Sequence, residues 1–259
     1  MAEREAARRP SRAALVFYGA CRVVAVGLSR ALFPGRVVGL EQLPKRGPYI
    51  LAPVHRSNID WLVVARLTRR RFRYIVKAEV WRAGPVGRFI ELLGAFPVHR
   101  EAADRESLQR CLAVLAGGEP LVLFPEGTRR EGVEVTDLRE GAAYLALRAG
   151  VPIVPVGLAG TDRAMPRGAK RFHPTHVMIV VGAPLNATAP VAAGEGRTAR
   201  VPRSANSALT EELRVALERV LANALALDRL RRGSGVASTA VAAPPRESSG
   251  GAEPPGGGG

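Results

Sequence analysis

The chain has 259 residues, enough for one large α/β domain, and 47% of them are hydrophobic, which suffices for an ordinary core. Its formal net charge of +15 favours anionic partners: nucleic acid, a phosphorylated substrate or an acidic membrane surface. The two cysteines, Cys21 and Cys111, have no metal-ligand spacing around them, which argues against a zinc site, implies no disulfide and fits a reducing, cytoplasmic setting.

Residues 1–35 predict a basic, amphipathic, membrane-associating segment. Its apolar part is interrupted by Arg22 and Arg30, and the uninterrupted pieces at 13–21 and 23–29 are shorter than the roughly 20 residues of a spanning helix. No small-residue cleavage site follows a clean apolar core, which argues against a secretory signal. We expect an interfacial helix whose arginines extend toward lipid head groups. The alternative is an amphipathic helix packed on the domain.

Residues 36–231 alternate between strand-like and helix-like patterns, which predicts one domain. The predicted strands are residues 37–40, 49–52, 73–76, 95–98, 121–124, 153–158 and 177–181. The predicted helices are residues 58–67, 86–93, 105–116, 138–149 and 207–230. Short apolar strands separated by helices predict an α/β fold with a mainly parallel sheet and helices on both faces. Functional sites in such sheets lie at the carboxyl ends of the strands.

Local signals mark some boundaries of these elements. Asp137 and Glu140 have the spacing of a capping box, and Gly150 is a stop signal for the same helix. Residues 183–205 indicate a loop before the last helix. Residues 232–259 are Gly, Pro, Ser and Ala with almost no large apolar side chains, which predicts a disordered tail.

A histidine and a carboxylate stand five residues apart where a short apolar run gives way to a helix. That spacing excludes a same-face helical pair and fits a turn. We expect the strand to end near Val54. Ser57 or Asn58 is expected to cap the helix, with Asp60 in its first turn, where the helix dipole favours an anion. Asp60 can then fix the tautomer of His55 and make it a general base, although an ordinary helix cap beside a satisfied histidine also fits.

Two further stretches place charged groups after predicted strands. One ends in Arg100, whose guanidinium can bind a phosphate through two parallel hydrogen bonds. The other, residues 121–129, ends in a turn expected to expose the Glu126 carboxylate, the Gly127 amide and the Arg129 guanidinium together. A tight turn with an ordinary ion pair is the alternative. Neither GxxxxGK[ST] nor GxGxxG occurs nearby, so nucleotide hydrolysis and dinucleotide binding lack their motifs.

Together with a buried-strand pattern at 151–156, these stretches resemble the glycerolipid acyltransferases of the lysophosphatidate acyltransferase type. The matching boxes are His-x4-Asp at 55–60, Gly-x-Phe-x-x-x-Arg at 94–100, Phe-Pro-Glu-Gly-Thr-Arg at 124–129 and Val-Pro-Ile-Val-Pro-Val at 151–156. The resemblance covers roughly residues 36–185. Residues 161–168 further resemble actinobacterial members of the family.

The resemblance implies transfer of a fatty acyl group from acyl-CoA or acyl-ACP to the sn-2 hydroxyl of 1-acylglycerol 3-phosphate, which yields phosphatidic acid. It implies His55 as general base, oriented by Asp60, without an acyl-enzyme; no GxSxG elbow is present and neither cysteine adjoins the histidine. It also implies a pocket for the acceptor phosphate and glycerol formed by Arg100, Glu126, Gly127, Thr128 and Arg129, with Lys77 as an extra cation. No metal or bound cofactor is expected, because the thioester is a substrate.

The expected partners are acyl-CoA or acyl carrier protein, lysophosphatidic acid and an anionic membrane surface, with no nucleic acid. The expected location is peripheral or monotopic, on the cytoplasmic face of the plasma membrane. Val54 stands where many family members have Asn, and Arg139 stands near a usual Phe-Lys pair. These departures leave open another acceptor: glycerol 3-phosphate, another lysophospholipid or a glycolipid. A remote alternative is a non-enzymatic basic protein that binds nucleic acid or anionic membrane through arginine runs such as 69–73.

Overall fold

The computed structural model describes residues 12–77, 84, 90–91, 93–98, 105–166, 168–169, 171–187 and 201–239. Its helices are α2 (Arg12–Leu32), the 3-10 helix η1 (Leu40–Gln42), α3 (Asp60–Val64), α5 (Arg105–Ala116), α6 (Gly141–Ala149), α7 (Thr161–Ala164) and α8 (Arg203–Thr239). Its strands are β1 (Gly35–Val38), β2 (Ile50–Pro53), β3 (Arg73–Lys77), β4 (Ala95–Val98), β5 (Leu121–Val122), β6 (Ile153–Ala159) and β7 (Val177–Val181). The helix predicted at 86–93 lies mostly outside the described residues.

The strands form one seven-stranded sheet in the order β1-β7-β6-β2-β5-β3-β4. Neighbouring strands are parallel except β6 and β7, which pair antiparallel. Strands β2 and β6 are buried along their whole lengths, as expected where helices cover both faces of a sheet. The predicted α/β fold with a mainly parallel sheet is therefore confirmed. Strands β2 to β6 share one direction, so their carboxyl ends meet at one edge of the sheet.

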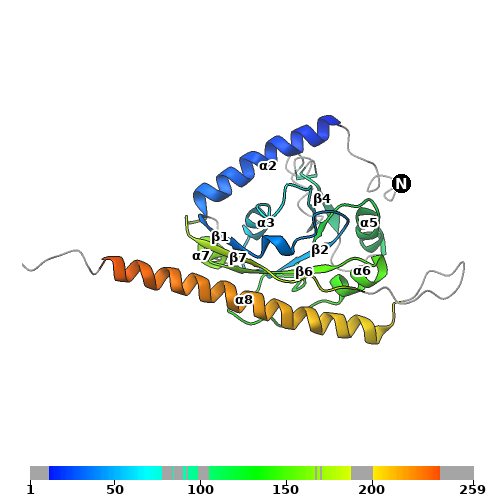
Figure 1. Ribbon diagram of the computed structural model, residues 1–259. Helices are drawn as coiled ribbons and strands as arrows, with labels where there is room; N and C mark the ends of the chain where they lie inside the picture. Colours follow the sequence, from blue (N-terminus) through cyan, green and yellow to red (C-terminus); the bar gives the residue numbers. More distant parts are fainter. Residues whose placement is uncertain are drawn as a thin grey trace, which may run out of the picture.

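Helix α8 runs along one face of the sheet, beside β6 and β7, while α2 and α3 lie over the opposite face (Figure 1). Its buried side chains recur every three or four residues, at Leu209, Leu213, Leu217, Leu221 and Ala224. A Cβ atom at Gly157 of β6 would lie 2.2 Å from the carbonyl oxygen of Val220, so only glycine lets the helix backbone approach the strand this closely. The long amphipathic helix thus covers β6 and β7 on one face of the sheet.

Helix α6 begins later than expected, and the predicted capping box is wrong. Asp137 has a positive φ of 51°, and the N-cap residue Glu140 makes no side-chain cap bond. The Glu140 carboxylate instead accepts hydrogen bonds from Asn206 and Ser207 in the first turns of α8, so a tertiary contact replaces the local one. The predicted stop at Gly150 is confirmed, with a φ of 62°.

Helix α8 is longer than the helix predicted at 207–230. It continues to Thr239, so residues 232–239 are helical rather than part of a disordered tail. The rest of the predicted tail, residues 240–259, and the basic residues 1–11 lie outside the described residues.

The N-terminal apolar helix is present as one continuous helix of 21 residues. Its segment Leu15–Leu32 is long and apolar enough to cross a membrane by length and composition, with a mean hydropathy of 1.5. Each of the uninterrupted apolar pieces, 13–21 and 23–29, is too short to span a membrane, but both lie in one helix that carries Arg22 within its apolar segment. The expectation that Arg22 extends toward lipid head groups is wrong, because its guanidinium donates to the carbonyl oxygens of Ala65 and Thr68, next to α3.

Candidate active site

His55 lies at the carboxyl end of β2. The backbone N–H of Val54 donates to the carbonyl oxygen of Val156 at 3.0 Å, so the chain stays bound to β6 for one residue beyond the strand. The next residue is His55, whose side chain is 19% exposed. Its Nδ1 lies 2.9 Å from Oδ2 of Asp60, the first residue of α3. The predicted contact between histidine and carboxylate across a turn is present.

One oxygen of the fully buried Asp60 organises this turn. Oδ2 accepts the backbone N–H groups of Arg56 at 2.7 Å and Ser57 at 2.8 Å, and it also faces Nδ1 of His55. These partners hold the carboxylate in one orientation. With Nδ1–H donating to Asp60, the Nε2 lone pair of His55 can accept a proton. Within the part of the chain that the structure describes, Nε2 has no hydrogen-bond partner.

The predicted caps of α3 are wrong. Ile59 is the N-cap residue and makes no side-chain cap bond. The hydroxyl of Ser57 accepts the N–H of Ile59, which precedes the helix, at 3.4 Å, and donates to the carbonyl oxygen of Met165 at 2.9 Å, which ties the turn to the end of α7. Asn58 is exposed. The Asp60 carboxylate takes over the role of satisfying backbone N–H groups around the turn.

The loop after β5 folds back over His55. The ring of Phe124 stacks on the imidazole, with centroids 4.2 Å apart and an interplanar angle of 27°. The backbone N–H of His55 donates to Oε2 of Glu126 at 2.7 Å, and the carbonyl oxygen of His55 accepts the N–H of Arg130 at 2.9 Å. The loop therefore holds both backbone polar groups of the histidine.

The prediction that this loop exposes a carboxylate and a glycine amide is wrong. Glu126 is 1% exposed, and Nη1 of Arg56 lies 2.6 and 2.8 Å from its two carboxylate oxygens. The N–H of Gly127 donates to the carbonyl oxygen of Phe124 at 3.0 Å, so the turn itself uses it. A Cβ at Gly127, where φ is +66°, would lie 2.3 Å from Nε of Arg139. The glycine therefore makes room for an arginine of this chain.

The other predicted ligand residues occupy the same edge of the sheet or lie outside the described residues. Thr128 is exposed and Arg129 half-buried, between Glu126 and Arg130, which both contact the backbone of His55. Among the described residues, no hydrogen bond or ion pair engages the Arg129 side chain. Lys77 is the last residue of β3, and its side chain is not among the described groups. Arg100, which follows β4, is also outside it.

Sequence reasoning missed Arg56 and the stacking of Phe124 on the histidine. Arg56 is 5% exposed, although arginine is seldom buried without a partner. A signal for it was present: a glutamate after a buried strand needs a cation if it is not solvated, and Arg56 directly follows the histidine. The run 151–156 behaves as predicted, since β6 is a buried central strand.

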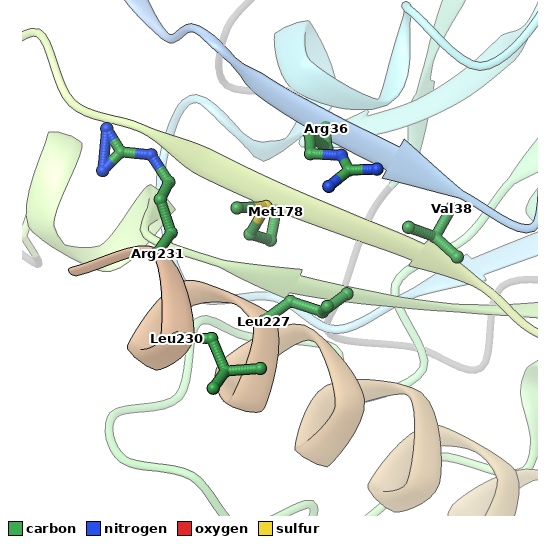
Figure 2. A pocket seen from close by; sticks show the side chains of 6 residues that line it. All are labelled: Arg36, Val38, Met178, Leu227, Leu230 and Arg231. Atoms are coloured by element: carbon green, nitrogen blue, oxygen red, sulfur yellow. The ribbon is translucent and has the colours of Figure 1, made fainter. Parts of the chain in front are cut away.

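A pocket of about 430 Å³ lies elsewhere, between α8 and the strands β1 and β7, of which β1 is an edge of the sheet (Figure 2). It is lined by Arg36, Val38, Met178, Leu227, Leu230 and Arg231. Two guanidinium groups flank an apolar floor, and the lining contains no carboxylate, imidazole, hydroxyl or thiol. This pocket offers no group for acid–base or nucleophilic chemistry, so the candidate site is assigned by the groups around His55.

The two cysteines are poor candidates for a nucleophile. Both cysteines are free, and burial raises the pKa of the Cys111 thiol to about 12. A thiol that stays protonated at neutral pH is a poor nucleophile. Among the described residues, no group of three or more His, Cys, Asp and Glu side chains could hold a metal ion.

Comparison with known proteins identifies the domain around this site. Residues 35–159 match the sequence model of a protein family described as Acyltransferase. These residues belong to the acyltransferase family. The acyltransferase domain thus contains His55, Asp60 and the loop from Phe124 to Arg130, and its matched range ends with β6.

Relatives of the acyltransferase domain have related names. A 1-acyl-sn-glycerol-3-phosphate acyltransferase of Chlamydomonas reinhardtii is 34% identical over 151 residues, which are 56% of this chain and 45% of that protein. A protein of the same name from Bacillus subtilis is 27% identical over 152 residues, 58% of this chain and 73% of that protein. The chain spans about half the length of the first curated relatives it matches.

The fold is also found in a solved structure. The crystal structure of a 1-acyl-sn-glycerophosphate acyltransferase from Thermotoga maritima superimposes with a TM-score of 0.61. The two sequences are 22% identical, and the match covers 80% of this chain and 79% of the other. The likeness shows that the mainly parallel sheet with flanking helices is shared.

Proposed function

We propose that the protein transfers a fatty acyl group from a thioester to the sn-2 hydroxyl of 1-acylglycerol 3-phosphate and so forms phosphatidic acid. The observation that carries the proposal is the pairing of His55 with buried Asp60 at the carboxyl edge of the sheet, with Nε2 unengaged by the described residues. The names of the relatives support this choice of acceptor.

In this mechanism His55 Nε2 removes the proton from the acceptor hydroxyl as the hydroxyl oxygen attacks the thioester carbonyl. The new C–O ester bond forms and the C–S bond breaks, so the sulfur leaves with the bonding electron pair. The imidazolium then returns its proton to the thiolate. Asp60 keeps the imidazole in the tautomer that leaves Nε2 unprotonated, and it stabilises the imidazolium without taking the proton itself.

The transfer is direct, from donor to acceptor, without an acyl-enzyme. The described nucleophile nearest in sequence to His55 is Ser57, and its hydroxyl is bound to the carbonyl oxygen of Met165. The donor is acyl-CoA or acyl-ACP, which serves as a substrate, and the proposed reaction uses no metal or bound cofactor.

The acceptor phosphate is proposed to bind Arg129, with Lys77, which ends β3, and Arg100, which follows β4 in the sequence, as further cations. We expect Arg129→Ala to raise the KM for lysophosphatidate about 10-fold or more while kcat changes little, because one charge-assisted hydrogen bond is lost in both ground and transition states. Steady-state kinetics with varied acceptor measures this. Arg130→Ala removes a neighbouring half-buried guanidinium that pairs with Asp137, and it should keep the wild-type KM. An unaltered KM in Arg129→Ala would exclude phosphate binding there.

Helix α2 is proposed to attach the domain to the cytoplasmic face of an anionic membrane. Its outward side exposes large apolar side chains, with Val23 and Val24 68% and 69% exposed. We expect the double variant Val23→Asp/Val24→Asp to bind vesicles of anionic phospholipid at least about 10-fold more weakly, because two buried apolar contacts are lost and two like charges are added. Vesicle sedimentation measures this. Val133→Asp, at an exposed loop residue, is the matched control, and wild-type binding by the double variant would contradict the proposal.

The choice of acceptor is tested by one panel. The purified protein is supplied with acyl-CoA or acyl-ACP and with lysophosphatidate, glycerol 3-phosphate, lysophosphatidylcholine or a glycolipid. The proposal predicts the highest kcat/KM for lysophosphatidate. A higher kcat/KM for another acceptor would identify that acceptor as the substrate. Salt-sensitive nucleic-acid binding without any acyl transfer would contradict the proposal that the protein is an enzyme.

A further inference from the structure

The Arg56 guanidinium joins the turn of His55 to the loop after β5. Its Nη1 donates to both carboxylate oxygens of Glu126, at 2.6 and 2.8 Å, and its Nη2 donates to the carbonyl oxygen of Glu134 at 2.8 Å. Both charged groups are almost completely buried, with side chains 4% and 0% exposed. A buried ion pair with this geometry has no solvent to replace either partner.

These contacts belong to a closed ring of hydrogen bonds that joins four residues: His55, Glu126, Arg56 and Asp60. The backbone N–H of His55 donates to Glu126, and Glu126 is bound by the side chain of Arg56. The backbone N–H of Arg56 donates to Asp60, and Asp60 faces Nδ1 of His55. Arg56 therefore links the carboxylate that binds the backbone N–H of His55 to the carboxylate that binds its imidazole.

We propose that Arg56 is a positioning residue for the transfer reaction: it neutralises Glu126 and so holds His55 in the orientation and charge environment that a general base needs. The inference rests on the proposed function of His55. It also assigns Glu126 a new role, because both of its oxygens are already bound within the protein. Glu126 accepts the backbone N–H of His55 and so orients the histidine, rather than binding glycerol oxygens of the acceptor.

The charges that face His55 explain why a cation is required here. Two carboxylates contact the histidine, Asp60 at Nδ1 and Glu126 at the backbone N–H, and Arg56 is the described cation that contacts Glu126. On the same loop, Arg130 is paired with the exposed Asp137. An uncompensated second carboxylate would favour the protonated imidazole, which cannot accept the proton of the acceptor.

The test compares Arg56→Gln, Glu126→Gln and the double variant. Arg56→Gln leaves a buried negative charge beside the imidazole, so the acid limb of the kcat profile should move up by about one pH unit. Its kcat should fall about 10- to 100-fold, with little change in acceptor KM, because the reacting nitrogen is displaced. Glu126→Gln should move the acid limb of the kcat profile to lower pH. The double variant removes both charges and should return the limb to within a few tenths of the wild-type pH.

A readout without turnover separates this inference from the proposed function. The His55 imidazole is identified in NMR spectra by the loss of its signal in His55→Gln. Its titration should move up in Arg56→Gln, move down in Glu126→Gln and stay near wild type in the double variant, even if the proposed acceptor is not the substrate. Arg214→Gln breaks ion pairs on exposed parts of α8 and should leave the titration unchanged. If Arg56→Gln does not fold, Glu126→Gln and the double variant carry the test. Coincident titrations for wild type, Glu126→Gln and the double variant, or a rise in acceptor KM alone, would overturn the inference.

Discussion

Replacing His55 by glutamine is expected to abolish acyl transfer while the protein stays folded. Glutamine is similar in size and its amide can still reach Asp60, but it has no basic nitrogen at the position of Nε2. General-base assistance contributes about 10²–10⁴-fold, so kcat should fall by at least that range. Thiol release from acyl-CoA in the presence of lysophosphatidate measures the rate, and thermal unfolding measures the fold.

The matched control for this substitution is His173→Gln. His173 is exposed in the segment before β7, so the same chemical change should leave the rate within about twofold of wild type. If His55→Gln keeps wild-type kcat, His55 is not the base. If it unfolds, the loss of activity has no mechanistic meaning, and His55→Asn offers a smaller replacement with the same missing basic group.

Asp60→Asn is expected to have the second largest effect, a loss of about 10²–10⁴-fold in kcat with little change in KM. The carboxylate is fully buried, and its Oδ2 accepts two backbone N–H groups as well as facing the imidazole. Asparagine can keep the backbone bonds through its single oxygen. It cannot stabilise the imidazolium that forms when His55 takes the proton, and its NH₂ group can favour the wrong tautomer.

The comparison variant for Asp60→Asn is Asp137→Asn, which loses an exposed pair with Arg130 and should retain full activity. Stability is measured for both by thermal unfolding. A kcat for Asp60→Asn within about threefold of wild type would show that the carboxylate only holds the turn before α3. A raised acceptor KM with unchanged kcat would place Asp60 in binding instead.

The sheet and the histidine–carboxylate pair are the features that sequence predicts best. All seven strands occur at the predicted places, because short apolar runs between polar turns have few other ways to be buried. The five-residue spacing of His55 and Asp60 excludes a helical pair and leaves a turn, which the structure contains with a distance of 2.9 Å.

The role of Glu126 shows where local reasoning ends. Its sequence neighbours indicate an exposed turn, yet it is buried because Arg56, 70 residues earlier in the chain, reaches it. Neither residue has an apolar pattern that would predict burial, and the pairing arises only when β2 and β5 lie side by side. The same holds for Glu140, whose expected cap bond is replaced by contacts with the first turns of α8.

Two helices are longer than the sequence patterns indicated. Helix α8 extends beyond its predicted end although its last turns contain Gly and Ser, which are weak helix formers. Arg22 interrupts the apolar pattern of α2, and the interruption indicated two apolar pieces that are each too short to span a membrane. In the structure its guanidinium binds backbone carbonyls next to α3, so the charge is satisfied and the helix continues.

Rapid mixing of the purified protein with acyl-CoA, with and without lysophosphatidate, tests the proposed transfer most directly. Direct attack by the acceptor predicts that thiol is released only when lysophosphatidate is present, with one phosphatidate formed for each thiol. A burst of thiol equal to the enzyme concentration without acceptor, with the acyl group bound to the protein, would contradict direct transfer. Thiol release that yields free fatty acid and no phosphatidate would contradict the proposed function itself.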